Sequence, residues 1–377
     1  MRLYVYSLLL NAYIGWRLLP ELSAGSPAFA VTLAWLVAAA VLAPVGMFAR
    51  RINRQPLADR LAWAGLLAMG SFSSLLVLTL LRDAALAVGW IVNAVAGDGT
   101  ALADFRHYSA AGVPLLALAF TLVGLLNARR RPRVRTVKVP IADLPEGLQD
   151  FTIVQISDLH VGPTIKRPYV DAVVDAVNRV GADLIAVTGD LVDGSVRELA
   201  HHTEPLSRLS ARHGTYFVTG NHEYYSGVRH WLAEIRRLGM RVLMNEHVVL
   251  HHAGAKLVVA GVSDYGAQHF DPSHRSDPAA AIAGAPPDGL VKLLLAHQPR
   301  SAFAAEPAGF HLQLSGHTHG GQFFPWNFFV RFQQPFTAGL HRLGALWVYT
   351  SRGTGYWGPP KRLGAPSEIT RLKLVRA

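Results

Sequence analysis

Two histidines lie two residues apart in the glycine-bounded segment Gly316 to Gln322, directly after the apolar run Leu312 to Leu314. An imidazole binds a divalent cation through one ring nitrogen, so His317 and His319 could each serve a different metal ion. Four more polar segments follow apolar, β-branched runs in the same way. Together the five segments bring these side chains to predicted strand ends: Asp158, His160, Asp190, Asn221, His222, His297, His317 and His319.

This set of side chains suits the hydrolysis of a phosphate ester, which needs a nucleophile, charge neutralisation and protonation of the leaving group. Two divalent ions about 3.5–4 Å apart can activate a bridging water and clamp the phosphate. Asp190 is the candidate bridge, since it is the single acidic residue of its motif at the strand end. Asp158 and His160 point the same way by the two-residue period of an extended chain, so both can reach one ion.

The remaining ligands would be neutral. Asn221 offers an amide oxygen, which limits the negative charge in a site that must accept an anion, and His297, His317 and His319 fill the other positions. His222 could donate a proton to the leaving oxygen if it stays off the metal. The chain has no cysteine, so thiolate ligands are excluded, and the donor set suits Mn, Fe or Zn without distinguishing them.

Composition places part of the chain in a bilayer. The 377 residues are 51% hydrophobic, with a formal net charge of +11. We expect about four transmembrane helices within residues 1–128, each long enough to cross a hydrocarbon core of about 30 Å. The apolar runs are Leu3 to Leu19, Ala28 to Ala49, Leu61 to Leu81 and Ala110 to Leu126. The first run could instead be a signal peptide, and the short run Ala85 to Ala96 is expected to be re-entrant or interfacial.

Arginines set the expected orientation. Arg50, Arg51, Arg54 and Arg60 crowd the second loop, and the fourth run leads into the basic run Arg129 to Arg135. By the positive-inside rule this predicts a multi-pass inner-membrane protein with a cytoplasmic C-terminal region, an orientation that an odd number of spans would reverse. The basic run could contact nucleic acid, but its position next to a span favours anionic membrane lipids. Few ionisable residues lie within the spans, which favours an anchor over a transporter.

After a basic juxtamembrane linker at 129–140, residues 141–377 have the pattern of an α/β catalytic domain. Short buried runs such as Thr152 to Ile156 and Leu184 to Val187 alternate with helical stretches, which predicts a parallel sheet with covering helices. The helical stretches are Tyr169 to Val180, Glu198 to Arg212 and Val228 to Leu238. Later strands, from Val248 to Val375, have fewer helices between them and predict a second, mixed sheet packed on the first.

The five motifs together resemble those of the calcineurin-like metallophosphoesterase superfamily. They are Ser157-Asp158-Leu159-His160, Gly189-Asp190-Leu191-Val192-Asp193, Gly220-Asn221-His222-Glu223, Ala296-His297 and Gly316-His317-Thr318-His319-Gly320-Gly321-Gln322. Their order is that of the superfamily. The last block, with the later Ser351-Arg352-Gly353, is similar to that of its bacterial membrane-anchored branch. The resemblance implies two packed mixed β-sheets flanked by helices, in agreement with the strand pattern.

The resemblance also implies residue roles. Asp158, His160, Asp190 and His319 would hold one divalent ion, and Asp190, Asn221, His297 and His317 the other, with His222 near the substrate phosphate. None of these positions departs from the superfamily pattern, so the resemblance implies a metal-dependent phosphoric ester hydrolase rather than a silent metal-binding scaffold.

Each of three further residues could have either of two roles. Asp193 could accept a hydrogen bond from an imidazole or form a turn with Gly194, and Glu223 is expected to cap or brace the following helix rather than bind metal. Arg352 could clamp a phosphate or serve the loop that contains it.

The substrate class is the least specified expectation. A phosphodiester is favoured, and a catalytic domain anchored near lipids would suit a lipid-linked phosphoester. Trp326, Phe328, Phe329 and Phe332 could serve such a substrate, form core, or rest on a membrane. The alternative is a pyrophosphatase that cleaves UDP-2,3-diacylglucosamine in lipid A synthesis, as some members of the superfamily do. The oligomeric state is not specified by the sequence.

Overall fold

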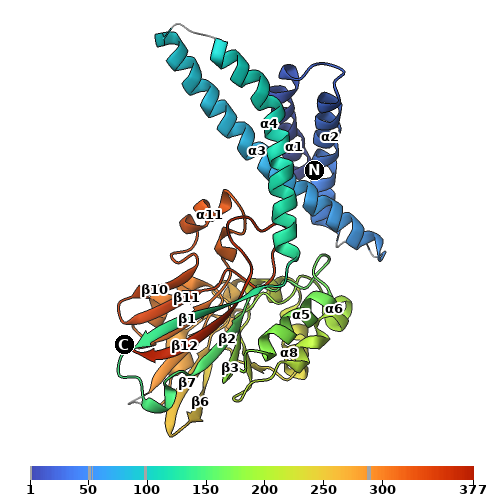
Figure 1. Cartoon of the computed structure of the whole chain (residues 1–377). Coiled ribbons are helices and arrows are strands. Elements are labelled where there is room, and N and C mark those ends of the chain that lie inside the picture. Colours follow the sequence, from blue (N-terminus) through green and yellow to red (C-terminus); the bar gives the residue numbers. More distant parts are fainter. Residues whose placement is uncertain (1, 50–51, 53, 97–99, 287–289) are drawn as a thin grey trace. The chain divides into compact units, whose positions relative to one another are not determined.

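The computed structural model describes residues 2–49, 52, 54–96, 100–286 and 290–377, which fall into two compact units (Figure 1). Unit 1 comprises Met1–Arg129 and Gly358–Leu363, and unit 2 comprises Arg130–Trp357 and Gly364–Ala377.

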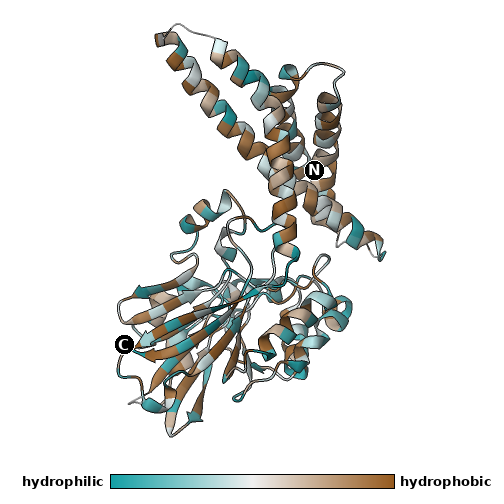
Figure 2. Cartoon of the chain, viewed as in Figure 1, coloured by the Kyte–Doolittle hydropathy of each residue, from teal (hydrophilic) through white to brown (hydrophobic). Residues whose placement is uncertain are grey.

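Unit 1 is built from long apolar helices, coloured mostly as hydrophobic in Figure 2. Its helices are α1 Arg2–Leu18, α2 Pro27–Phe48, α3 Leu57–Ala96 and α4 Thr100–Arg129. Among the described residues, α2, α3 and α4 are long and apolar enough to cross a membrane, whereas α1 has only 17 residues. We predicted a separate re-entrant or interfacial segment at Ala85 to Ala96. This prediction is wrong, because the stretch continues α3 without a break.

A pair of glycines allows α2 and α3 to approach closely. A Cβ atom added to Gly65 would lie 2.3 Å from the Leu42 carbonyl oxygen and 2.4 Å from the Gly46 Cα. Both neighbours are backbone atoms that cannot move aside by rotating a side chain. Close backbone approach at small residues is a common way of packing membrane helices.

Unit 1 also contains Gly358–Leu363, which the sequence pattern assigned to the catalytic domain. The Lys361 Nζ donates hydrogen bonds to the Gly70 carbonyl oxygen, at 2.9 Å, and to the Ser74 hydroxyl. The Arg362 amide donates to the Gly124 carbonyl oxygen at 2.8 Å. These contacts tie a segment close to the C-terminus to α3 and α4.

Unit 2 contains two sheets, each of six strands in the described residues. The first has the order β1 Arg133–Ile141, β12 Glu368–Arg376, β2 Thr152–Ile156, β3 Leu184–Val187, β4 Thr215–Phe217 and β5 Arg241–Val242. The second has the order β10 Gly339–Leu343, β11 Leu346–Thr350, β9 Leu312–Ser315, β8 Val291–Leu295, β7 Ala255–Gly261 and β6 Glu246–His252.

Both sheets are mixed. In the first, β12 runs antiparallel to β2 while the pairs β2–β3, β3–β4 and β1–β12 are parallel. In the second, β10–β11 and β6–β7 are antiparallel and β7–β8, β8–β9 and β9–β11 are parallel. Residues 133–140, which were expected in a linker, form most of β1.

The main core lies between the sheets, where side chains such as Ile153 and Leu184 of the first sheet pack with Leu293 and Leu314 of the second. Helices α5 Arg167–Asn178, α6 Val196–Thr203 and α8 Val228–Arg237 lie beside the first sheet (Figure 1). Helix α6 ends earlier than predicted, because Pro205 lacks the amide that would continue it. The predicted fold class, two packed mixed sheets flanked by helices and preceded by apolar helices, is confirmed.

The Gly46–Gly65 contact makes a prediction about stability. Gly65→Ala should lower the free energy of unfolding of unit 1 by about 1–3 kcal/mol, because the added methyl group overpacks two backbones. The midpoint of thermal unfolding of the detergent-solubilised chain should fall accordingly. Gly112→Ala is the matched control, since a Cβ at Gly112 in α4 meets no atom of the described residues within 4 Å. Equal midpoints for the two variants would contradict the close-packing argument.

Candidate metal centre

The predicted site residues follow the ends of strands from both sheets. Asp158 and His160 follow β2, Asp190 follows β3, and Asn221 begins the short helix α7 Asn221–Tyr225 after β4. His297 follows β8, and His317 and His319 follow β9. These strands run parallel within each sheet, so their carboxyl ends meet at one edge, where ligands collect in open α/β sheets.

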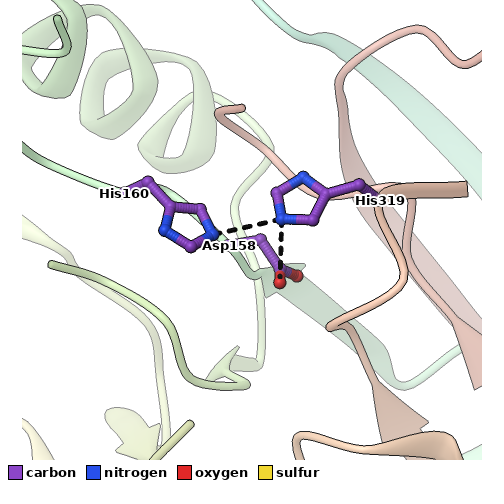
Figure 3. A group of neighbouring side chains, drawn as sticks. All are labelled: Asp158, His160 and His319. Atoms are coloured by element: carbon purple, nitrogen blue, oxygen red, sulfur yellow. Dashed lines mark hydrogen bonds and ion pairs between the residues drawn. The ribbon is translucent and has the colours of Figure 1, made fainter. Parts of the chain in front are cut away.

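The first cluster joins Asp158, His160 and His319, which converge as shown in Figure 3. The Nε2 atoms of His160 and His319 face each other at 3.1 Å, and the Asp158 Oδ1 lies 3.5 Å from the His319 Nε2. All three residues are buried. Two imidazole nitrogens and a carboxylate oxygen are thus directed at one point, as a metal ion would require.

The second cluster joins Asp190, His297 and His317. The Asp190 Oδ2 lies 3.1 Å from the His297 Nε2, and the His317 Nδ1 lies 3.2 Å from that same nitrogen. The Asp190 Oδ2 is also 3.8 Å from the His160 Nε2 of the first cluster. One oxygen of Asp190 therefore lies between the two clusters, and its role as a bridging carboxylate stays a prediction.

Asn221 adds an unused acceptor. In the described part of the chain, its buried Oδ1 has no hydrogen-bond partner. A buried amide oxygen without a partner costs free energy, and a cation would satisfy it. Together with the facing imidazole nitrogens of both clusters, this atom shows that the residues present fit a pair of divalent metal ions.

Unusual backbone conformations aim these side chains. Asp158, His160, Asp190, His317 and His319 have φ values of 54°, 52°, 53°, 69° and 51°, in the left-handed region that non-glycine residues seldom adopt. Such strained residues gather at functional sites and persist only where the surroundings fix them.

Two glycines make room for the carboxylates. A Cβ at Gly220 would lie 2.1 Å from the Asp190 Oδ1, and one at Gly316 would lie 2.2 Å from the Asp158 Oδ2. The glycines of these motifs are therefore required by close approach of the backbone to the two acids.

His222 is held beside the clusters by Asp193. The His222 Nδ1 lies 2.5 Å from the Asp193 Oδ1, and its Nε2 lies 4.0 Å from the Asp190 Oδ2. The Asp193 Oδ2 lies 3.3 Å from the His160 Nδ1. Of the two readings that the sequence left open, the structure thus supports Asp193 as an acceptor for imidazoles, and one carboxylate orients two rings.

Glu223 and Arg352 have partners outside the two clusters. The Glu223 carboxylate accepts a hydrogen bond from the Gly220 amide at the start of α7, as predicted, and it also accepts from the amides of Asp190 and Leu191 in the loop after β3. The Arg352 guanidinium forms an ion pair with Glu368 at 3.2 Å, which favours a role in its own loop.

The buried charges influence one another strongly. Burial raises the pKa of Asp158. Burial also opposes ionisation of Asp190, but the imidazoles of His297 and His222 outweigh it and hold the pKa of Asp190 well below its usual value. Burial lowers the pKa of His222, yet Asp190 and Asp193 outweigh that effect and raise it to about 9. Burial lowers the pKa of His317 to about 3. Perturbed groups of this kind are typical of functional sites.

The aromatic residues near the last motif are not core. Trp326, Phe328, Phe329 and Phe332 lie in α11 Trp326–Phe329 and the following turn, and between 48% and 75% of each remains exposed. The structure instead brings Tyr225 and Trp357 against His222, with ring centroids 5.2 Å and 6.0 Å away. Sequence reasoning missed both, because neither belongs to a motif and Trp357 is remote in the chain.

Comparison with known proteins agrees with this geometry. A sequence profile of the calcineurin-like phosphoesterase family matches residues 151–321, which include all eight predicted site residues. A bovine transmembrane protein with a metallophosphoesterase domain is 42% identical over 280 residues, covering 70% of this chain and 63% of its own length. The chain thus spans less than two thirds of that relative.

Bacterial relatives are matched over more of their length. An uncharacterized metallophosphoesterase of Campylobacter jejuni is 34% identical over 262 residues, covering 69% of this chain and 68% of its own. Among solved structures, a 5′-nucleotidase precursor from Thermus thermophilus aligns with TM-score 0.38 and 14% identity, covering 60% of this chain and 54% of that one. The apolar helices and the transmembrane relatives identify a membrane protein. The chain belongs to the calcineurin-like phosphoesterase family.

Proposed function

We propose that the protein is a membrane-anchored phosphodiesterase that uses two divalent metal ions. Asp158, His160, Asp190 and His319 would hold one ion, and Asp190, Asn221, His297 and His317 the other. The observation that carries the proposal is the Asp190 Oδ2, which lies 3.1 Å from the His297 Nε2 and 3.8 Å from the His160 Nε2, between the two clusters. Two bound cations would neutralise the phosphoryl oxygens and supply an activated water.

His222 has the geometry of a general acid. Asp193 fixes its Nδ1, so its Nε2 is the nitrogen left to face the reacting group. The side chain keeps 13% of its surface exposed while its neighbours Asp190 and His160 keep 3% and 1%, so it lies on the open side of the site. A proton held at the Nε2 would pass to the leaving alkoxide oxygen, which expels a poor leaving group without a strong base in solution.

Charge favours a diester over a monoester. Asp158, Asp190 and Asp193 are all buried at the site, and the positive charge of Arg352 is already balanced by Glu368. A diester carries a single negative charge near neutral pH, whereas a monoester carries up to two. Three ionised carboxylates carry −3 against +4 from the two proposed cations, so the net charge of about +1 matches a diester monoanion more closely than a monoester dianion.

The membrane arrangement is also a proposal. The basic run Arg129 to Arg135 next to α4 supports a multi-pass inner-membrane protein whose catalytic unit faces the cytoplasm, with the arginines near anionic lipid headgroups. This orientation is proposed from the arginines beside the last span and does not depend on how many spans precede it.

Removing the charge of Asp190 should abolish catalysis. Asp190→Asn keeps the shape of the side chain but removes the carboxylate shared by both clusters. We expect turnover of bis(p-nitrophenyl) phosphate with added Mn²⁺ to fall by far more than about 100-fold, the upper range for changes to outer partners of metal ligands. Asp143→Asn, at an exposed position in the same unit, is the matched control. Wild-type turnover in Asp190→Asn would rule out the bridging role.

The loss of activity in His222→Ala should depend on the leaving group. His222→Ala should slow hydrolysis of a dialkyl phosphate by about 10²–10⁴-fold, the usual contribution of general acid catalysis, and slow a p-nitrophenyl ester much less. Metal content, measured by plasma emission, should not change. The exposed His230→Ala serves as the control. An equal loss on both esters would exclude proton donation by His222.

Asp193 should set the alkaline limb of the pH profile. His222 donates only when protonated, so dialkyl phosphate hydrolysis falls as the pH rises through its pKa, which Asp190 and Asp193 hold at about 9 against the lowering effect of burial. Asp193→Asn removes one of the two carboxylates, so we expect that limb to move about 1–3 units toward acid. The ratio of dialkyl to p-nitrophenyl hydrolysis, measured against pH, isolates this effect. If the alkaline limb lies at the same pH in Asp193→Asn and in the wild type, Asp193 does not set the pKa of the proton donor.

A further inference from the structure

Three large aromatic side chains lie exposed beside His222. Tyr225, Phe270 and Trp357, here called the aromatic rim, keep 62%, 53% and 53% of their surface exposed. All three belong to unit 2. Leaving this much aromatic surface in water forgoes stabilisation that burial would provide, and exposed apolar patches mark binding sites.

The aromatic rim contacts the ring of His222, the proposed general acid. The His222 ring packs edge to face against Tyr225, with centroids 5.2 Å apart, and against Trp357, with centroids 6.0 Å apart. Phe270 extends the surface outward, since its centroid lies 5.5 Å from that of Tyr225. A group that touches the Nε2 of His222 would therefore lie against these rings.

The same segments that position the metal clusters also position the rim. Tyr225 ends α7, the helix that begins at Asn221. The Trp357 amide donates to the Gln322 Oε1 and its carbonyl oxygen accepts from the Gln322 Nε2, both at 2.8 Å. The Gln322 amide in turn donates to the His319 carbonyl oxygen at 3.0 Å. The rim is thus fixed relative to the site before any substrate arrives.

The position of the rim identifies which part of the substrate it meets. In the proposed hydrolysis, an oxygen from water forms a bond to phosphorus, the bond from phosphorus to the leaving oxygen breaks, and that oxygen takes the proton of His222. The attacking water releases a proton to solvent, and His222 regains one from solvent. The leaving alcohol must therefore contact His222, and its body extends over the rim.

The chemistry of the rim is apolar. Its three side chains bring one hydroxyl group, one indole N–H and no charge, and Asp271, next to Phe270 in the chain, is paired with Arg229 at 3.5 Å. A nucleoside would need partners for the polar edge of its base, whereas an alkyl chain needs none. The protein also lies in a membrane, where alcohols with alkyl chains are abundant.

We propose that Tyr225, Phe270 and Trp357 bind the alkyl chain of the leaving alcohol. The enzyme would then cleave phosphodiesters of lipid-type alcohols at the bond between phosphorus and the oxygen of the lipid alcohol. This inference rests on the proposed phosphodiesterase function and adds the substrate class to it.

Methyl octyl phosphate tests the proposal, because its two alcohols differ little in acidity and greatly in apolar surface. The ratio of octanol to methanol released by the full chain in detergent with Mn²⁺, read by mass spectrometry, reports which alcohol lies on the rim. We expect at least tenfold more octanol than methanol. Tyr225→Ala and Trp357→Ala should each lower that ratio threefold or more.

Phe303→Ala is the control, since Phe303 is 60% exposed and packs with Phe336 rather than with His222. It should leave the ratio unchanged. A methyl nucleoside phosphate forms the second arm, and preferential release of the nucleoside without a preference for octanol would make the rim a base-stacking surface and overturn the proposal. A ratio near one in the wild type, or equal effects of all three variants, would also overturn it.

Different results would contradict the rim inference and the phosphodiesterase proposal. If the wild type hydrolyses bis(p-nitrophenyl) phosphate but shows no preference for octanol, the rim inference alone is wrong. If it hydrolyses none of these diesters with metal supplied, the phosphodiesterase function is wrong and the inference falls with it.

Discussion

The site is organised around the buried carboxylate of Asp190. Its Oδ1 accepts a hydrogen bond from the His222 amide at 2.9 Å, and its Oδ2 faces the imidazoles of His297, His160 and His222 at 3.1, 3.8 and 4.0 Å. A carboxylate that is only 2% exposed is stable as an anion only where positive charge or hydrogen bonds compensate for lost hydration. Three rings directed at one oxygen supply that compensation, and bound cations would supply more.

The surrounding loops bear the conformational cost of this arrangement. Left-handed backbone at non-glycine residues costs of order 1–3 kcal/mol at each position, and five of the proposed metal ligands adopt it. Hydrogen bonds between loops hold these conformations, as where the Asp158 amide donates to the Gly189 carbonyl oxygen at 3.0 Å and the Gly316 amide donates to the His297 carbonyl oxygen at 2.9 Å. The core between the two sheets keeps the strand ends, and so the loops, in register.

Much of the fold follows from local patterns. The runs Thr152 to Ile156, Leu184 to Val187 and Val291 to Leu295 coincide with β2, β3 and β8, because a buried parallel strand is mostly apolar along its length. Strand β1 was missed because its arginines and lysine alternate with valines on a largely exposed edge and resemble a basic linker. Helix α3 was divided at Arg82 and Asp83, yet these charges find partners within unit 1, Ser109 and Arg17.

The site was more predictable than its surroundings. Metal chemistry limits the ligand types, and the motifs follow strand ends, so all eight candidate residues could be named from the sequence. Their roles stay predictions. The orientation of His222 by Asp193, the aromatic rim, and the placing of Gly358–Leu363 in unit 1 depend on contacts between distant segments, which no local pattern encodes.

The central claim is that two cations share Asp190. Anomalous diffraction from crystals of the full chain grown with Mn²⁺ tests it directly. We expect two manganese peaks, one among Asp158, His160 and His319 and the other among Asp190, His297 and His317, with Asp190 contacting both. A single peak, or two peaks that do not share Asp190, would contradict the account.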